Sequence, residues 1–253
     1  MGLGPVIRLA QLSDTHIVGE VGGLSFGEDS AANLSAVVDS FPVRPDVAVI
    51  TGDLAEDGSI EAYRKTRALT SALAEELHVV DGNHDDRAHM YDVFGARDDV
   101  RVVPVTARWT MVLVSSQWPG HDIGRIAPET LDNLEHALGR TRQHTVVCMH
   151  HPPASTCDNP YCGIVNAAEA MRVLRRHRHV RAVLSGHLHR AFDHVHDGIR
   201  FLGAPSTCVQ LMHGGNPHFR PTSAPPAARL LELHGDGAIT YETVSARYAD
   251  SAR

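Results

Sequence analysis

Apolar and polar residues alternate in blocks along the chain, and the blocks predict strands and helices in turn. Short apolar runs bounded by polar residues or glycine are typical of buried strands. Such runs occupy residues 6–13, 46–51, 77–81, 109–116, 145–150 and 181–185. The segments between them repeat apolar residues at helical spacing, over residues 29–41, 59–76, 86–94, 127–139 and 166–177. Strands that alternate with helices favour an α/β fold built around a parallel sheet.

Residues at the starts of these helical segments have side chains that commonly cap helices. Asp29 or Ser30 stands at the start of the first helix and Ser59 at the start of the second. Their side-chain oxygens can accept a hydrogen bond from a backbone N–H of the first turn. Asp85 and Asp86 precede the third helix, and we expect them to act as its caps.

The hydrophobic pattern changes toward the C-terminus. Residues 193–205 and 229–244 each have the pattern of a hairpin, and the second turns at its Gly-Asp-Gly sequence at 235–237, which is typical of tight turns. Residues 216–228 are rich in proline and are predicted to form a loop. No internal repeat or low-complexity linker divides the chain, so we expect a single domain over residues 1–253 with antiparallel strands at its end.

Composition places the chain among ordinary globular proteins and excludes several kinds of partner. Hydrophobic residues make up 43% of its 253 residues and charged residues 21%, both usual for a folded domain. The net charge of −7 argues against binding along the phosphate backbone of a nucleic acid. No run approaches the ~20 apolar residues that a membrane-spanning helix needs. The N-terminal residues lack the pattern of a signal peptide, so a cytoplasmic protein is expected, either a monomer or a homodimer.

Two features match known motifs but are given ordinary roles. The segment from Gly23 to Gly27 fits the G-x-S-x-G pattern of a nucleophilic serine, but no strand precedes it as that motif requires. We predict a mobile loop near the functional site instead. Cys157 and Cys162 lack the second cysteine pair that a zinc site of this type needs, and we expect both to be free thiols. Cys148 is expected to be buried in its strand.

Side chains that can bind a metal follow the ends of five predicted strands. The carboxyl ends of the strands in an open α/β sheet border one crevice, so these side chains are expected to meet there. The set consists of carboxylates, one amide and imidazoles: Asp14, His16, Asp53, Asn83, His84, His150, His151, His187 and His189. Oxygen and nitrogen donors without cysteine favour a divalent ion such as iron, manganese or zinc.

The spacing within these motifs suits shared ions. Residues two apart in an extended segment point to the same side, so Asp14 and His16 can reach one ion together. The same holds for His187 and His189. Glycines at 52, 82 and 186 each come directly before one of the donors, and we expect them to let the backbone turn sharply and approach the ion.

The motifs at residues 14–16, 52–53, 82–84, 150 and 186–189 together resemble those of the calcineurin-like metallophosphoesterases. In particular, the segments GNHDDR and HHPP are similar to those of bacterial class III cyclic-nucleotide phosphodiesterases and their glycerophosphodiesterase relatives. The resemblance implies the metallo-dependent phosphatase fold, a four-layer α/β/β/α arrangement in which a sandwich of two sheets is flanked by helices. It also implies a centre of two divalent metal ions with a bridging hydroxide.

The resemblance further implies a role for each residue of the motifs. The first ion would be held by Asp14, His16, Asp53 and His189. The second would be held by Asp53, Asn83, His150 and His187, with Asp53 bridging the two ions. Asn83 and His84 stand in the catalytic motif, where Asn83 offers a neutral amide oxygen and His84 faces the substrate phosphate without binding metal. His151 is expected to support His150 from behind.

The function implied by the resemblance is hydrolysis of 3′,5′-cyclic AMP or a related small phosphodiester by a metal-activated hydroxide. Glycerophosphodiesters or a broad range of phosphoesters are alternative substrates, because the same core suits them. A scaffold or binding protein on the same fold is a non-enzymatic alternative, and the complete ligand set argues against it. Glu56 stands where purple acid phosphatases have a ligating tyrosine, so their iron–tyrosinate colour is not expected. The segments 152–165 and 206–226 are expected to select the substrate.

Overall fold

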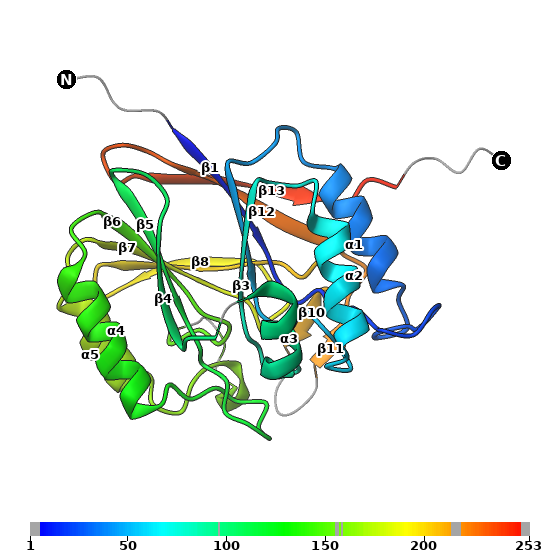
Figure 1. Cartoon of the computed structure of the whole chain (residues 1–253), viewed down its shortest axis with the longest axis horizontal. Helices are drawn as coiled ribbons and strands as arrows, with labels where there is room; N and C mark the ends of the chain where they lie inside the picture. Colours follow the sequence, from blue (N-terminus) through cyan, green and yellow to red (C-terminus); the bar gives the residue numbers. More distant parts are fainter. Residues whose placement is uncertain (1–5, 96, 155–156, 158, 214–218, 249–253) are drawn as a thin grey trace.

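Two mixed β-sheets pack face to face in the computed structural model of the chain, which describes residues 6–95, 97–154, 157, 159–213 and 219–248 (Figure 1). The first sheet has the strand order β13-β12-β1-β2-β3. Its strands are Ile7–Leu12 (β1), Val47–Thr51 (β2), Glu76–Val80 (β3), Ala227–Leu233 (β12) and Ile239–Ser245 (β13). Strands β1, β2 and β3 run parallel, whereas β12 and β13 are antiparallel to their neighbours.

The second sheet has the strand order β4-β5-β6-β7-β9-β8. Its strands are Val100–Pro104 (β4), Trp109–Val114 (β5), His144–Cys148 (β6), Val180–Ser185 (β7), Phe192–His196 (β8) and Ile199–Gly203 (β9). The four central strands run parallel, and the two edge strands are antiparallel to them. The two predicted C-terminal hairpins are therefore the pairs β8–β9 and β12–β13, as expected from the sequence.

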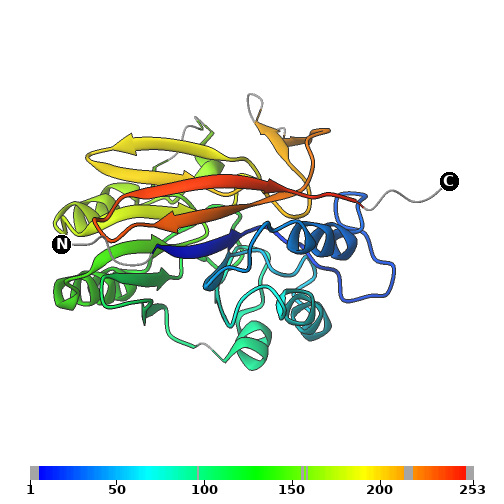
Figure 2. The same cartoon turned by 90° about the horizontal axis from the view of Figure 1, so that it is seen from above.

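Helices cover the outer face of each sheet (Figures 1 and 2). The first sheet is covered by Ser30–Asp39 (α1), Ile60–Thr70 (α2) and Arg87–Phe94 (α3). The second sheet is covered by Pro128–Arg140 (α4) and Ala167–Arg175 (α5). The arrangement has four layers in the order helix, sheet, sheet, helix, which confirms the predicted fold class.

Apolar side chains fill the spaces between all four layers. Leu9 of β1, Trp109 of β5 and Leu231 of β12 are among those that pack between the sheets. Because both faces of the sheets are covered, the central strands lose the alternation of apolar and polar residues that a half-exposed strand has. Every residue of β2 and β5 is buried, which explains why these strands appear in the sequence as continuous apolar runs.

Several element boundaries differ from the predictions. Helix α2 ends at Thr70 rather than at residue 76, because Glu76 already pairs with Val47 in the first sheet. Helix α4 continues past residue 139 to Arg140. Strand β4 was not predicted, since it is a partly exposed edge strand that ends in Pro104.

The Pro-rich segment 216–228, predicted as a loop, contains strand β11 and the start of β12. Strand β11 (Phe219–Pro221) pairs with Leu211–His213 (β10) to form a separate two-stranded sheet. Both of these strands are short, and short strands carry too little periodicity to be recognised in a sequence.

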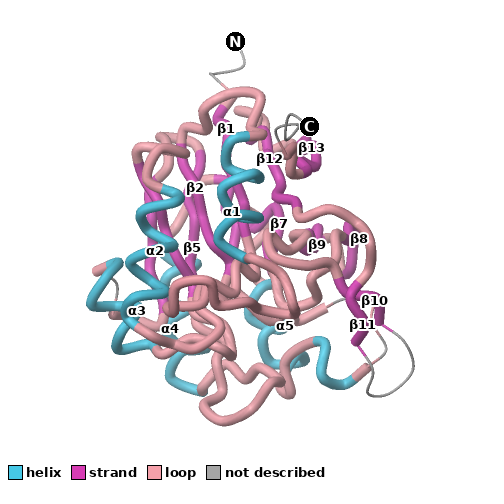
Figure 3. The backbone as a smooth tube through the Cα atoms, turned by 90° about the vertical axis from the view of Figure 1, so that its right-hand side faces the viewer, coloured by secondary structure: helices cyan, strands magenta, loops and turns pink. Residues whose placement is uncertain are grey.

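Backbone hydrogen bonds bring together the loops that follow the parallel strands of the two sheets (Figure 3). The N–H of Asp14 donates to the carbonyl of Gly52, and that of His16 donates to the carbonyl of Asp53, each at 3.0 Å. Within the second sheet, the N–H of Gly186, after β7, donates to the carbonyl of His150, after β6, at 3.0 Å. Between the two sheets, the N–H of His187 donates to Oδ1 of Asp14 at 3.0 Å. The predicted metal-binding motifs therefore meet at one end of the sandwich. Within the described residues, no helix has the length and apolar character needed to cross a membrane.

Candidate metal centre

Backbone strain is concentrated at the predicted metal ligands. Within the described part of the chain, seven non-glycine residues have positive φ, and five of them are predicted ligands: Asp14, His16, Asp53, His187 and His189. Their φ angles lie between 44° and 68°, in the left-handed region that costs most residues about 1–3 kcal/mol. Such strain persists where the surrounding structure fixes the backbone, and it clusters at functional sites.

Glycines allow the chain to pass close to these ligands. Gly52 has a φ of +94°, and a Cβ at this position would overlap the ring of His150. A Cβ at Gly186 would overlap the hydroxyl of Ser13 and lie 2.9 Å from Oδ2 of Asp14. A Cβ at Gly82 would overlap Asp53. The close approach expected from the three glycines is confirmed.

Two histidines from opposite ends of the chain face each other in the first group of donors. Nδ1 of His16 donates to Oε2 of Glu56 at 2.6 Å, and Nδ1 of His189 donates to the carbonyl of Val209 at 2.9 Å. With these tautomers each Nε2 has a lone pair, and the two Nε2 atoms are only 3.0 Å apart. This separation suits two nitrogens that share one cation, either a metal ion or a proton.

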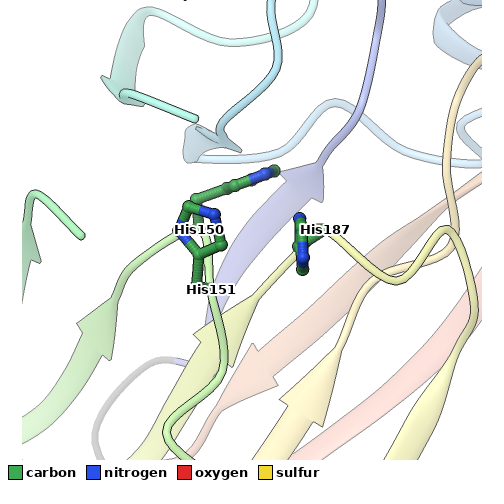
Figure 4. Close-up of side chains that lie close together, drawn as sticks. All are labelled: His150, His151 and His187. Atoms are coloured by element: carbon green, nitrogen blue, oxygen red, sulfur yellow. The ribbon is translucent and has the colours of Figure 1, made fainter. Parts of the chain in front are cut away.

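A second pair of histidines, His150 and His187, is also held through one ring nitrogen each. Nδ1 of His150 donates to the carbonyl of Thr51 at 2.8 Å, and Nε2 of His187 donates to the carbonyl of Tyr161 at 2.7 Å. The other ring nitrogen of each lies 3.1 Å from Oδ1 of Asn83. Figure 4 shows His150 and His187 on the loops that follow β6 and β7. An imidazole fixed through one nitrogen by a carbonyl or carboxylate is typical of a metal ligand.

Asp53 lies between the two groups. Its Oδ2 is 3.2 Å from Nε2 of His150 and 3.7 Å from Nε2 of His16. Asp14 belongs to the first group, with Oδ1 at 3.6 Å from Nε2 of His189. The buried Oδ2 of Asp14 has no hydrogen-bond partner, and a buried carboxylate oxygen is costly to leave unsatisfied. One donor atom each from Asp14, His16, Asp53 and His189 can be chosen so that all lie within 4.8 Å of one another.

Asp53 and His150 strongly influence each other's pKa. Burial works against the charged form of both Asp53 and His150, but their mutual attraction outweighs it. The result is a pKa of about 9 for His150 and a pKa of Asp53 that lies well below its usual range. Burial and the nearby charge of His150 lower the pKa of His187 to about 4. A neutral His187 has a lone pair available for a metal.

The ring of His84 lies beside that of His16, with 4.8 Å between their centroids, and its nitrogens are close enough to share an ion with His16 and Glu56. The side chain of His84 is 35% exposed and lines the neighbouring cavity, with Nδ1 at 3.8 Å from Oε2 of Glu56. Its backbone N–H donates to Oδ1 of Asp53 at 2.9 Å. The adjacent Asn83 directs its amide oxygen toward His150 and His187. The two residues therefore project in different directions, as the sequence analysis expects.

His151 lies near enough to His150 and His187 to form a third group of possible donors (Figure 4). Both of its ring nitrogens are already engaged, however. Nδ1 is 2.9 Å from the hydroxyl of Ser116, and Nε2 donates to the carbonyl of Asp122 at 3.1 Å. This arrangement is consistent with the predicted supporting role.

Glu56 and Asp85 contribute to the site in ways that the sequence analysis did not anticipate. Glu56 holds His16, and its only signal in the sequence is its position three residues after Asp53. Asp85 is buried and accepts hydrogen bonds from the backbone N–H groups of Leu54, Ala55 and Gly82 and from the hydroxyl of Tyr63. It therefore fixes the loop that carries Asp53.

The helix caps were predicted correctly except at Asp85. Asp29 caps α1, Ser59 caps α2 and Asp86 caps α3, each by accepting a hydrogen bond from the first turn. The prediction that Asp85 also caps α3 is wrong. Its carboxylate turns inward instead, because the N–H groups of the loop after β2 would otherwise be buried without partners.

Two loops border the cavity in front of the predicted metal ligands. Cys157 and Cys162 form a disulfide, so the expectation of free thiols is wrong. Cys162 is the last residue of the short helix Pro160–Cys162, and its Cα lies 6.1 Å from that of Cys157. The ring of Phe26 lies 5.4 Å from that of His16, so the segment from Gly23 to Gly27 lies near the site as predicted. Cys148 is buried in β6, also as predicted.

The cavity has a volume of about 560 Å³, which is within the usual range for small-molecule sites. Its described lining consists of His16, Phe26, Asp53, Glu56, Asn83, His84, Asp122, Tyr161, His187, Leu188, His189, Leu211 and Phe219. Neither lysine nor arginine occurs among these residues. Positive charge near a bound anion would therefore have to come from metal ions and histidine.

Comparison with known proteins identifies the family. The calcineurin-like phosphoesterase family matches residues 7–191. The chain is 33% identical over 240 residues to the 3′,5′-cyclic adenosine monophosphate phosphodiesterase CpdA of Pseudomonas aeruginosa, covering 92% of this chain and 88% of that protein. It is 32% identical over 252 residues to the protein of the same name from Escherichia coli K12, covering 93% and 88%.

The chain belongs to the calcineurin-like phosphoesterase family, and with it to a class of hydrolases. A dimetal phosphatase from Danio rerio has a similar fold, with a TM-score of 0.69 and 16% identity over 96% of this chain and 100% of that one. Family membership and the clustered donors together support a centre for two divalent metal ions.

Proposed function

We propose that this chain hydrolyses 3′,5′-cyclic AMP or a closely related cyclic nucleotide with the help of two divalent metal ions. The names of its bacterial relatives support this substrate. The cavity in front of the metal ligands is large enough for a nucleotide. The reaction adds water across one phosphorus–oxygen bond of the cyclic phosphate, which leaves a phosphomonoester and a free hydroxyl.

The assignment of ligands follows the two groups of donors. Asp14, His16, Asp53 and His189 would hold the first ion, and Asp53, Asn83, His150 and His187 would hold the second. Imidazole and carboxylate ligands suit iron, manganese and zinc alike. When bound, a pair of such ions lowers the pKa of coordinated water and stabilises charge on the attacking and leaving oxygens.

The protein's own residues position the substrate and move protons. His84 lines the cavity beside the ligands, within reach of a phosphoryl oxygen or of the leaving oxygen. From there its imidazole can donate a hydrogen bond or a proton as the phosphorus–oxygen bond breaks. Glu56, Thr51, Tyr161 and Val209 keep the four ligand histidines in the required tautomers.

The charge of the cavity favours diesters over monoesters. Two divalent ions bring four positive charges, and Asp14 and Asp53 remove two. The remainder suits a hydroxide and a monoanionic diester. A dianionic monoester would favour further cationic side chains, and none of the described lining residues is lysine or arginine.

The observation that carries this proposal is the 3.0 Å approach of Nε2 of His16 to Nε2 of His189, with Nδ1 of both rings already donating. Two imidazoles that are held in this way can share one metal ion between their Nε2 atoms. The cytoplasmic location and the choice between monomer and homodimer stay predictions from the sequence.

The test is a panel of three substrates given to protein reconstituted with manganese or iron: cyclic AMP, glycerophosphocholine and p-nitrophenyl phosphate. We expect cyclic AMP to give the highest kcat/KM and p-nitrophenyl phosphate the lowest. Preference for glycerophosphocholine would favour the alternative substrate class. Preference for the monoester would overturn the proposed diesterase, and no turnover of any of the three would support a binding role.

A further inference from the structure

One side of the cavity is apolar and is not used by the proposed metal centre. Phe26, Leu211 and Phe219 line it, and the two phenylalanines are 45% and 39% exposed. The ring of Phe26 borders the cavity and stays this exposed, so a ligand can cover it. None of the three side chains can bind a metal or transfer a proton.

This apolar side adjoins the first group of metal ligands. The ring of Phe26 lies 5.4 Å from the ring of His16 and 5.6 Å from that of His189, edge-on to both. The backbone N–H of Leu211 donates to the carbonyl of His189 at 3.0 Å. Tyr161, by contrast, contacts His187 in the second group. The cavity therefore has an apolar wall on one side of the phosphate position.

The β10–β11 hairpin supplies two of the three residues. Leu211 pairs with Pro221, and His213 pairs with Phe219. Because residues two apart on a strand share a face, Leu211 and Phe219 are diagonal neighbours on the same face of the hairpin. Met212 lies on the opposite face and lines a separate groove. Figure 2 shows the hairpin, in orange, standing out from the two sheets.

We propose that Phe26, Leu211 and Phe219 form a subsite for the planar base of a nucleotide, which rests on the proposed function. A base has two flat faces, and aromatic side chains bind such faces by stacking with little dependence on base identity. With the phosphate at the metal ligands, the base lies against this wall. Glycerophosphodiesters have no planar base that can stack in the subsite.

Asp122 is a charged residue at the rim of the same cavity. It is exposed and lines the cavity on the side of the second group, where its carbonyl accepts a hydrogen bond from Nε2 of His151. Its carboxylate repels additional phosphate groups. The subsite therefore fits a nucleoside monophosphate or its cyclic form better than a nucleoside di- or triphosphate.

The test compares two variants, Phe26→Leu and Phe219→Leu, with two matched controls. Leu24→Ala changes an exposed side chain of the same loop as Phe26, and Met212→Ala changes the opposite face of the hairpin; neither residue lines this cavity. The substrates are cyclic AMP and the 3′,5′-cyclic phosphate of 1-deoxyribose, which keeps the reacting ring but has no base. Binding of AMP and of ribose 5-phosphate is measured in parallel by calorimetry on metal-loaded protein.

We expect each phenylalanine variant to raise KM for cyclic AMP and Kd for AMP by roughly 5- to 100-fold, the usual effect of losing a base-stacking ring. Neither variant should change kcat, or affect the two compounds without a base, and the controls should behave like wild type. Equal effects on compounds with and without a base, or no effect at all, would overturn the subsite. If wild type fails to hydrolyse cyclic AMP yet binds AMP more tightly than ribose 5-phosphate, the proposed function fails while the subsite stands.

Discussion

Nδ1 of His16 donates a 2.6 Å hydrogen bond to Oε2 of Glu56. This bond fixes the tautomer of His16 and leaves the lone pair of Nε2 directed at Nε2 of His189. Glu56 also accepts a hydrogen bond from the hydroxyl of Ser25 at 3.2 Å, so its carboxylate is itself held in place. The orientation of one proposed ligand thus depends on a residue that binds no metal in the proposed centre.

Replacing Glu56 should weaken binding of the first ion. Losing the group that orients a ligating histidine typically reduces metal affinity by about 10- to 100-fold. Glu56→Ala should show this loss, and Glu56→Gln a smaller one, because the amide oxygen can still accept from His16. Calorimetric titration of the metal-free protein with manganese measures both. Glu61→Ala, an exposed position on α2, serves as the control, and wild-type affinity in Glu56→Ala would contradict this role.

The two groups of donors share Asp53, so its removal should affect both ions. Asp53→Ala should lose metal at both positions together with activity. Asn83→Ala removes one neutral ligand of the second ion only, and should retain the first. Metal analysis of the purified variants, expressed as ions per chain, separates the two outcomes. Two retained ions in Asp53→Ala would exclude a bridging role for this carboxylate.

His84 should affect the chemical step and not the metal content. His84→Ala should retain both ions and lose about 10²- to 10⁴-fold in kcat, the usual worth of a proton-transferring or hydrogen-bonding group. If His84 protonates the leaving oxygen, the loss should shrink for substrates with p-nitrophenolate as leaving group, which needs no proton. If it stabilises a phosphoryl oxygen instead, the loss should be similar for all leaving groups. Unchanged turnover with intact metal would remove His84 from the mechanism.

The hydroxyl of Tyr63 should contribute to the stability of the folded protein around the site. Its buried hydroxyl donates to Oδ1 of Asp85 at 3.1 Å and accepts from the N–H of Asp86 at 2.7 Å. Tyr63→Phe leaves the buried carboxylate of Asp85 with one hydrogen bond fewer and the N–H of Asp86 without this acceptor, which should lower the free energy of unfolding by about 1–3 kcal/mol. Urea unfolding measures this change. The exposed Tyr248→Phe should cost less, and equal stability of the two variants would argue against a structural role for the Tyr63 hydroxyl.

The parts of the site that were predicted from the sequence are those whose residues directly follow a recognisable strand. Asp14, Asp53 and His187 each follow an apolar run that forms a parallel strand, and parallel strands deliver their following loops to one end of a sheet. The two-sheet arrangement was expected only from the resemblance to the calcineurin-like metallophosphoesterases and does not follow from this rule. The edge strand β4 and the β10–β11 hairpin carried too little periodicity to be predicted.

The groups that orient the ligands were not predicted, because they are distant in sequence and mostly belong to the backbone. The carbonyl of Val209 holds His189, and the carbonyl of Tyr161 holds His187. Any residue type can offer a carbonyl, so no side-chain pattern marks these positions. The bond between Cys157 and Cys162 was missed for a related reason: their pairing depends on the turn between them, and the sequence offered only their spacing.

The central claim is that two ions share Asp53, one held with His16 and His189 and the other with His150 and His187. Anomalous X-ray scattering from crystals grown with manganese tests it most directly. The account predicts two peaks, one on each side of Asp53, the first within coordination distance of Nε2 of both His16 and His189. A single peak, or peaks that do not contact Asp53, would contradict it.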